Sequence, residues 1–163
     1  LKALNLDQSF AVPAMLPGMR PTTIHIKTKL HRLIMHKAGS NIDMDTMITS
    51  DPDPNLRHNV KGTVTRSGCC IGGTDAIGLP LASKPLELGL HDDMINEVIF
   101  ALYYGGALKF DLTGKDLGQD LSQYGIDSLV MHIDFWLPPI ITGCKRPKNQ
   151  LTVEIGDMGI HAT

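Results

Sequence analysis

Apolar and polar residues alternate along two segments in the first third of the chain, residues 23–30 and 41–49. Alternation with a period of two separates the side chains of a β-strand between its two faces. Residues 38–41, between these segments, have the Gly, Ser and Asn of a turn, so the two strands are predicted to pair as a hairpin. The prolines of residues 51–55 break regular structure because proline lacks a backbone donor. Residues 60–65 are predicted to be a weaker strand.

The period changes from 2 to 3.6 over residues 92–104, which predicts one amphipathic helix. Asp92 is placed to cap its N-terminus, and Gly105-Gly106 offers a left-handed cap at its C-terminus. The polar face is predicted to hold Asp93, Asn96 and Glu97, and the apolar face Met94, Ile95, Val98, Ile99 and Leu102.

Period-2 alternation also marks four segments around and after this helix, namely residues 86–90, 108–112, 129–137 and 151–155. Pro138-Pro139 ends the longest of them, and the last is predicted to continue beyond a turn at Gly156-Asp157. Residues 68–84 are rich in Gly and lack periodicity, which favours a linker or a crossing between sheets. Long alternating strands with one main helix predict an α+β fold of mostly antiparallel, curved β-sheet.

Composition and charge exclude several classes of protein. The 163 residues suffice for one ordinary domain or for parts of two. The net charge is −2 and no run of cations occurs, so no nucleic-acid partner is expected, because that function needs a basic surface. No segment approaches the roughly 20 consecutive apolar residues of a transmembrane helix. No signal peptide is visible in the sequence from Leu1-Lys2 onward, and it stops at Thr163 within an alternating segment, so we expect a fragment or a processed product.

Side chains that could carry chemistry all have structural explanations. The seven histidines are dispersed without the spacing of metal ligands, and the acidic pairs Asp43/Asp45 and Asp92/Asp93 lie on a polar strand face and at a helix N-terminus. The sequence Gly125–Leu129 resembles the G-x-D-S-L box of acyl carrier proteins, whose serine carries phosphopantetheine at the start of a helix. A strand, not a helix, is predicted after Ser128. We therefore expect no enzymatic activity, no metal and no cofactor.

The three cysteines, Cys69, Cys70 and Cys144, allow two interpretations. They are buried or free thiols, or one disulfide joins the adjacent pair to Cys144 and indicates an oxidising compartment. Adjacent cysteines point to different sides of an extended chain, so only one of the pair can form this bridge. Cys69 is the favoured partner, and a bond between the adjacent cysteines is the least favoured pairing.

The segment around the predicted helix resembles a module of the tubular lipid-binding superfamily. The strand Leu86–Leu90 leads through His91-Asp92-Asp93 into a helix that ends with Ala101-Leu102-Tyr103-Tyr104-Gly105-Gly106. This is similar to the opening of the second barrel in the bactericidal/permeability-increasing protein family. It is more similar still to bacterial, lipoprotein-like envelope proteins with the same strand-helix-strand module. The resemblance is good over residues 84–113 and only architectural over residues 1–67.

The resemblance implies that residues 1–67 close a first barrel or sheet, residues 68–84 cross over, and residues 85–163 begin a second barrel. It also implies a non-enzymatic, lipid- or hydrophobe-binding module of the bacterial cell envelope, either periplasmic, outer-membrane-associated or secreted. Few aromatic residues (5%) and eight Met suit a pliable aliphatic lining. Three alternatives stay open: a structural or interaction protein with a closed core, a carrier or enzyme using Ser128 or a cysteine, and a cytoplasmic location. Association with the rest of a longer chain or with an assembly is also expected.

Periodicity and alternation select the side chains that would line a groove for acyl chains. Each buried CH₂ of such a ligand would contribute about 0.8 kcal/mol. The helix is predicted to contribute Ile95, Ile99 and Leu102. The strands are predicted to contribute Leu88, Leu90, Phe110, Leu112, Ile133 and Phe135.

Overall fold

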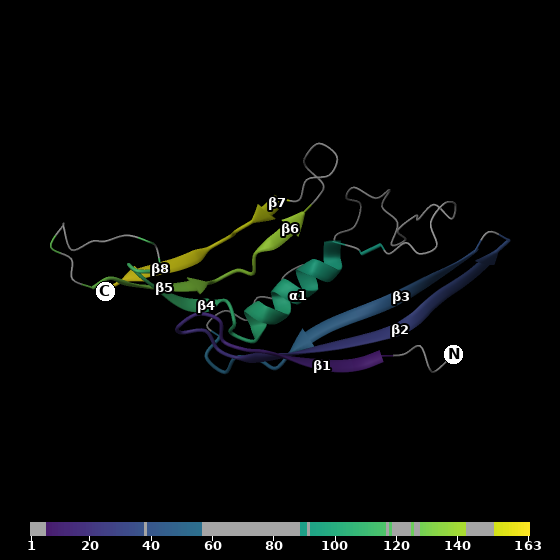
Figure 1. Cartoon of the computed structure of the whole chain (residues 1–163), viewed down its shortest axis with the longest axis horizontal. Helices are drawn as coiled ribbons and strands as arrows, with labels where there is room; N and C mark the ends of the chain where they lie inside the picture. The colour runs from purple at the N-terminus through teal and green to yellow at the C-terminus, as the bar shows by residue number, and fades with distance from the viewer. Residues whose placement is uncertain are drawn as a thin grey trace.

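A computed structural model describes residues 6–37, 39–56, 89–90, 92–116, 118, 125, 128–142 and 152–163. In chain order, its elements are β1 (Leu6–Val12), β2 (Thr22–His36), β3 (Gly39–Ser50), α1 (Asp92–Tyr104), β4 (Lys109–Thr113), β5 (Val130–Phe135), β6 (Ile140–Thr142), β7 (Thr152–Glu154) and β8 (Met158–Ala162). Every strand pairing among these residues is antiparallel. The predicted α+β class, with one helix and antiparallel sheets, is confirmed (Figure 1).

The first sheet has the strand order β1-β2-β3 and is dominated by the long β2–β3 hairpin. The predicted pairing of the two alternating segments is confirmed. The hairpin extends further than predicted because β2 continues past Leu30 through a register shift. Leu30 pairs with Met44 and Arg32 with Asp43, so His31 is the extra residue of a β-bulge. Strand β1 was not predicted.

The remaining strands form a second, interrupted ribbon. Strands β4, β5 and β8 make one sheet and β6 pairs with β7. As predicted, β5 stops before Pro138-Pro139 and the chain resumes a strand after Gly156-Asp157. The Trp136 N–H donates to the Asp157 carbonyl at 2.9 Å, which bridges the interruption. Residues 60–65, 68–84 and 86–88 lie outside the described residues, so the strands and linker predicted there stay predictions.

Helix α1 occupies the residues predicted for it, and its C-terminal cap is confirmed. Gly106 has a φ of 81°. The Ala107 N–H donates to the Leu102 carbonyl at 2.9 Å and the Gly106 N–H to the Tyr103 carbonyl at 3.0 Å. These two bonds form the Schellman motif, which requires a left-handed residue such as glycine. Asp92 is already helical, so it lies one position inside the cap predicted for it. Among the described residues, no helix is long and apolar enough to cross a membrane.

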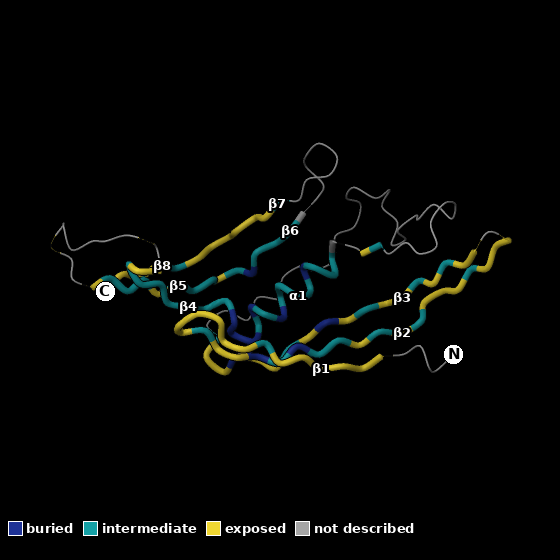
Figure 2. The backbone as a smooth tube through the Cα atoms, viewed as in Figure 1, coloured by how far each residue is buried: buried dark blue, intermediate teal, exposed yellow. Residues whose placement is uncertain are grey.

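The helix lies between the first sheet and the β6–β7 pair (Figure 1). The core is centred on Ile24, Ile48 and Ala101, and the partly buried apolar residues around it are Val12, Ile26, Met94, Val98 and Leu102. Figure 2 shows that burial is concentrated near the C-terminal end of α1 and falls toward the tip of the β2–β3 hairpin. Asn96, predicted on the polar face of the helix, is only 4% exposed because that face packs toward β6.

Candidate ligand-binding surface

The face of the first sheet that packs against α1, here called the inner face, carries most of the apolar side chains of the hairpin. Residues directly opposite in antiparallel strands share a face, and Ile24 and Ile48 belong to the core under α1. The register therefore assigns the other members of this face on both strands. They are Ile26, Thr28, Leu30, Leu33 and Met35 on β2, and Ser40, Ile42, Met44, Thr46 and Ser50 on β3.

The β-bulge keeps this face apolar. Two polar residues, His31 and Arg32, follow one another and interrupt the alternation of β2. In a regular strand this would move Leu33 and Met35 to the opposite face. Because the bulge absorbs His31, Leu33 lies opposite Ile42 and stays on the inner face.

The helix covers only part of the inner face. Under α1, Ile24 and Ile48 are 7% and 4% exposed, whereas Leu33 and Ile42 are 45% and 53% exposed. Figure 2 shows the same gradient along β2 and β3. We call the part beyond the helix the distal inner face; it comprises the half-buried Leu30 and the exposed Leu33, Met35, Ile42 and Met44. Exposed apolar side chains that lie together on one face make a candidate site of interaction.

The outer face of the same hairpin is solvated and ionic. Lys27 Nζ lies 3.6 Å from Asp7 Oδ2, Lys29 Nζ lies 3.5 Å from Asp45 Oδ2, and Arg32 Nη2 lies 2.7 Å from Asp43 Oδ2. Such exposed pairs contribute little to stability. They show that the outer face is the solvent-facing side of the hairpin.

Two side-chain bonds fix α1 over β3. Glu97 Oε2 accepts a hydrogen bond from the Ile48 N–H at 3.0 Å, and Ser50 Oγ donates to the Ala101 carbonyl at 2.6 Å. Burial raises the pKa of Glu97, the charge of Asp93 raises it further, and the Ile48 N–H partly offsets both. Glu97 therefore accepts a hydrogen bond from the Ile48 N–H of β3, although burial and the charge of Asp93 disfavour its ionised form.

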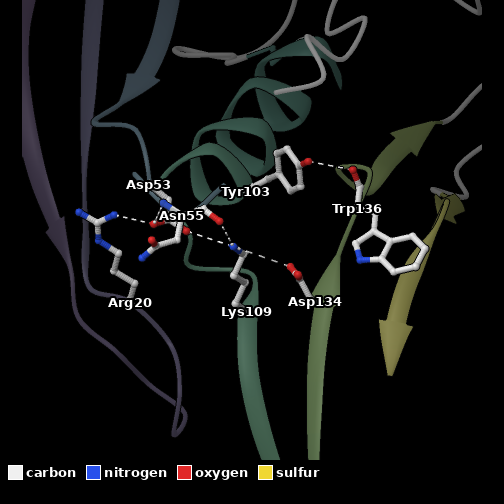
Figure 3. Close-up of polar contacts among 7 residues, drawn as sticks. All are labelled: Arg20, Asp53, Asn55, Tyr103, Lys109, Asp134 and Trp136. Carbon is white, nitrogen blue, oxygen red and sulfur yellow. Dashed lines mark hydrogen bonds and ion pairs between the residues drawn. The ribbon is translucent and has the colours of Figure 1, made fainter. Parts of the chain in front are cut away.

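The opposite side of α1 binds the interrupted ribbon through polar groups. Asn96 Oδ1 accepts from the Ile141 N–H at 2.7 Å, and Asn96 Nδ2 donates to the Ile141 carbonyl at 3.0 Å. Tyr103 Oη donates to the Trp136 carbonyl at 2.8 Å (Figure 3). Burial raises the pKa of Tyr103, and the charge of Asp134 adds to this. These bonds satisfy backbone groups near the break at Pro138-Pro139.

A buried carboxylate joins the two sheets at the C-terminal end of α1. Asp53 follows β3 and is 7% exposed. Its oxygens accept from Arg20 Nη1 at 2.9 Å and from Lys109 Nζ at 3.2 Å, and its backbone N–H donates to the Tyr104 carbonyl at 2.8 Å (Figure 3). Lys109, on β4, also lies 4.0 Å from Asp134 on β5.

The ionised form of Asp53 is favoured. Burial alone would raise the pKa of this carboxyl, but the Asn55 N–H, Lys109 and Arg20 outweigh burial and lower it. Because Asp53 pairs with Arg20 and with Lys109 of β4 and bonds to the end of α1, this cluster is a structural joint.

The predicted lining residues divide between two places. Phe110, Leu112, Ile133 and Phe135 share one face of the β4–β5–β8 sheet, because Phe110 pairs with Ile133, and the Phe110 and Phe135 ring centroids lie 6.4 Å apart. That face ends on Met158 and Ile160 of β8, which are 42% and 55% exposed.

On the helix, Ile95, Ile99 and Leu102 are half-buried. Leu102 packs against the core of the first sheet. Leu90 is 58% exposed, and Leu88 lies outside the described residues.

The other candidate residues gain no chemical role from the described structure. Ser128 is exposed and directly precedes Leu129 and β5, so the helix that a carrier protein needs at this serine does not follow it. Cys69, Cys70 and Cys144 lie outside the described residues. Among the residues that are described, no three His, Cys, Asp or Glu side chains form a group suited to a metal ion.

Sequence reasoning missed the distal inner face and the polar joints. The doublet His31-Arg32 between Leu30 and Leu33 was a usable signal for the bulge. A weaker signal for the polar joint to β6 was Asn96 in the middle of an amphipathic helix. The joint at Asp53 had no local signal, since its partners lie 33 and 56 residues away in sequence.

No protein family, curated protein or solved structure was found to match the chain.

Proposed function

We propose that the chain is a non-enzymatic module that binds lipid or another hydrophobic ligand, and that the distal inner face is the binding surface. One observation carries the proposal. The β-bulge keeps Leu33 and Met35 on the inner face beside Ile42 and Met44, although α1 covers only the other end of that face. If the hairpin served only to pack the helix, its uncovered end would need no apolar side chains.

The chemistry of the surface suits flexible acyl chains. Two of its five residues are Met, whose unbranched thioethers adapt to irregular apolar shapes, and the others are Leu or Ile. Covering these side chains with methylene groups contributes about 25 cal/mol per Å² of apolar surface removed from water. No covalent step is required. The proposed location is the cell envelope, supported by the resemblance of residues 84–113 to envelope proteins.

A matched pair of variants tests this function. Ile42 on the inner face and Met47 on the outer face of β3 are both 53% exposed. Ile42→Glu and Met47→Glu therefore add the same charge at equal exposure but on opposite faces. We expect Ile42→Glu to abolish the retention of lipid in native mass spectrometry and the binding of a hydrophobic fluorescent probe. Met47→Glu should retain both, and neither variant should lower the midpoint of thermal unfolding much.

Equal loss of binding in both variants, or no lipid and no probe binding by the wild-type protein, would refute the proposal. In the latter case a structural or interaction protein becomes the better interpretation of the same surface.

A further inference from the structure

Three side chains that can bind or orient a cation lie in one row across the β4–β5–β8 sheet. Asp111 on β4 pairs with His132 on β5, and His132 pairs with His161 on β8, so all three lie on the same face. The centroids of the two imidazole rings are 6.3 Å apart, and both histidines are exposed. The two histidines are far apart in sequence, so only the pairing of β5 with β8 brings them together.

Asp111 determines which nitrogen of His132 is available to a ligand. Its Oδ1 lies 2.7 Å from His132 Nδ1. An ionised carboxylate can only accept a hydrogen bond, so Nδ1 carries the proton and, in the neutral ring, Nε2 keeps its lone pair. A metal-binding histidine typically donates its other ring N–H to a partner of this kind.

The Asp111 carboxylate is itself held in place by a turn that passes over it. The Pro17 carbonyl accepts a hydrogen bond from the Asp111 N–H at 2.7 Å, and a Cβ atom placed on Gly18 would come within 2.8 Å of the carboxylate. The neighbouring row of the same face holds Lys109 and Asp134, an ion pair at 4.0 Å. The negative charge of Asp111 therefore lies beside the histidines, where it favours a cation.

From this arrangement we propose that His132 and His161 bind a divalent transition-metal ion through their imidazole nitrogens, with Asp111 as a positioning residue. Imidazole is a suitable ligand for Ni²⁺, Cu²⁺ and Zn²⁺. Each metal–nitrogen bond is about 2.0–2.1 Å long in a zinc site, and a small rotation of the two exposed side chains brings both rings to one ion. The part of the chain that the structure describes has no group of three His, Cys, Asp or Glu side chains suited to a metal, so the protein supplies two ligands and water completes the coordination. The ion ties β8 to β5, and its binding does not depend on the distal inner face of the first sheet.

The test uses Ni²⁺ as the probe, because thiolates such as those of the three cysteines favour softer ions. Isothermal titration calorimetry with NiCl₂ should show binding by the wild-type chain. His132→Gln and His161→Gln each leave a single imidazole in the row and should abolish this binding. Both variants should keep the circular dichroism spectrum and the unfolding midpoint of the metal-free protein, since the replaced side chains are exposed. Because Ni²⁺ is paramagnetic, it should also broaden the ring-proton NMR signals of His132 and His161 before those of the other histidines.

His31→Gln is the matched control. His31 Nδ1 also lies close to a carboxylate, 3.1 Å from Asp45 Oδ1, and its side chain is 59% exposed, but the pairing of β2 with β3 places no second histidine opposite it. This variant should bind Ni²⁺ as tightly as the wild-type chain. No binding by the wild-type chain, binding that survives both replacements in the row, or an equal loss in His31→Gln would overturn the proposal.

The positioning role of Asp111 has its own test. Asp111→Ala should weaken Ni²⁺ binding by about 10- to 100-fold, the usual effect of removing an outer partner of a metal ligand. Asp111→Asn still offers an oxygen to His132 Nδ1–H and should recover most of the affinity. Unchanged affinity in Asp111→Ala, or no recovery in Asp111→Asn, would overturn this role.

Discussion

Asn96 pairs with Ile141 as a residue of a neighbouring strand would. Its carboxamide oxygen accepts from the Ile141 N–H at 2.7 Å and its amide nitrogen donates to the Ile141 carbonyl at 3.0 Å. One helical side chain therefore satisfies both backbone groups of a β6 residue at the edge that β7 does not occupy. Side-chain hydrogen bonds join the helix to the ribbon and to the first sheet alike, and the first sheet also packs on the helix through the apolar core.

Replacing Asn96 with Ala should lower the free energy of unfolding by about 2–3 kcal/mol, because the Ile141 N–H and carbonyl lose their bonds to this side chain. Urea denaturation measures this change. Asn55→Ala is the matched control, since Asn55 is exposed and its bonds in the described structure use its backbone. An effect of equal size in both variants would show that Asn96 has no special role.

Asp53→Asn should destabilise the protein at neutral pH by about 2–3 kcal/mol, since Lys109 and Arg20 would lose a buried anionic partner. The folded-state pKa of Asp53 lies below its ordinary value of 3.8. Its contribution is therefore complete above the unfolded pKa and is lost as pH falls through the folded pKa. Urea titrations of both proteins should differ by a constant amount from about pH 5 to 8 and should begin to converge only as pH falls below 3.8 toward the lower folded-state pKa.

The neighbouring Asp51 provides the control for this experiment. Its side chain is 73% exposed and lies 3.5 Å from His25. Asp51→Asn should change the free energy of unfolding by less than about 0.5 kcal/mol. Convergence of the Asp53→Asn and wild-type curves at neutral pH would contradict the role assigned to the joint.

Glu97→Gln should stabilise the protein at pH 7 by about 0.2–0.5 kcal/mol, because it removes the like-charge pair with Asp93 one helical turn away. Glutamine still offers an oxygen to the Ile48 N–H. The folded-state pKa of Glu97 is raised above 4.5, so its ionised form costs stability at neutral pH and the cost disappears as pH falls through that pKa. The advantage of the variant should vanish near pH 4. Glu97→Ala, which removes the acceptor, should destabilise at both pH values.

Deleting His31 should be tolerated. The deletion converts the bulge into a regular strand in which Leu30, Leu33 and Met35 still share the inner face. Deleting Lys27, in the regular part of β2, should instead reverse the faces of all residues on one side of it and prevent folding. Circular dichroism and thermal unfolding of the two deletion variants distinguish these outcomes. A Lys27 deletion as stable as the His31 deletion would show that the register is not fixed by the inner face.

The local sequence pattern was enough to predict the elements that are determined by neighbouring residues. The helix bounds followed from the period of 3.6 and from Gly105-Gly106, and the β2–β3 hairpin followed from two alternating segments around a turn. Strand β6 could not be predicted, because three residues after a double proline carry no period of their own. It forms because Asn96 and β7 satisfy its backbone from either side.

The candidate site was less accessible to sequence reasoning. Alternation placed Phe110, Ile133 and Phe135 on one face, which the register bears out, but it could not say which element covers that face. The apolar side of α1 was assigned to a groove, whereas Val98, Ala101 and Leu102 pack on the first sheet. Which sheet a helix packs against depends on contacts between residues distant in sequence, and the periodicity of the helix does not predict it.

Gly106 serves the helix and the Asp53 joint at once. It takes the left-handed turn that ends α1, and a Cβ atom placed on it would come within 2.9 Å of Asp53 Oδ2. Any side chain at position 106 would therefore strain the cap of α1 and crowd the Asp53 carboxylate at the same time, so one substitution there would weaken the end of the helix and the joint between the sheets together.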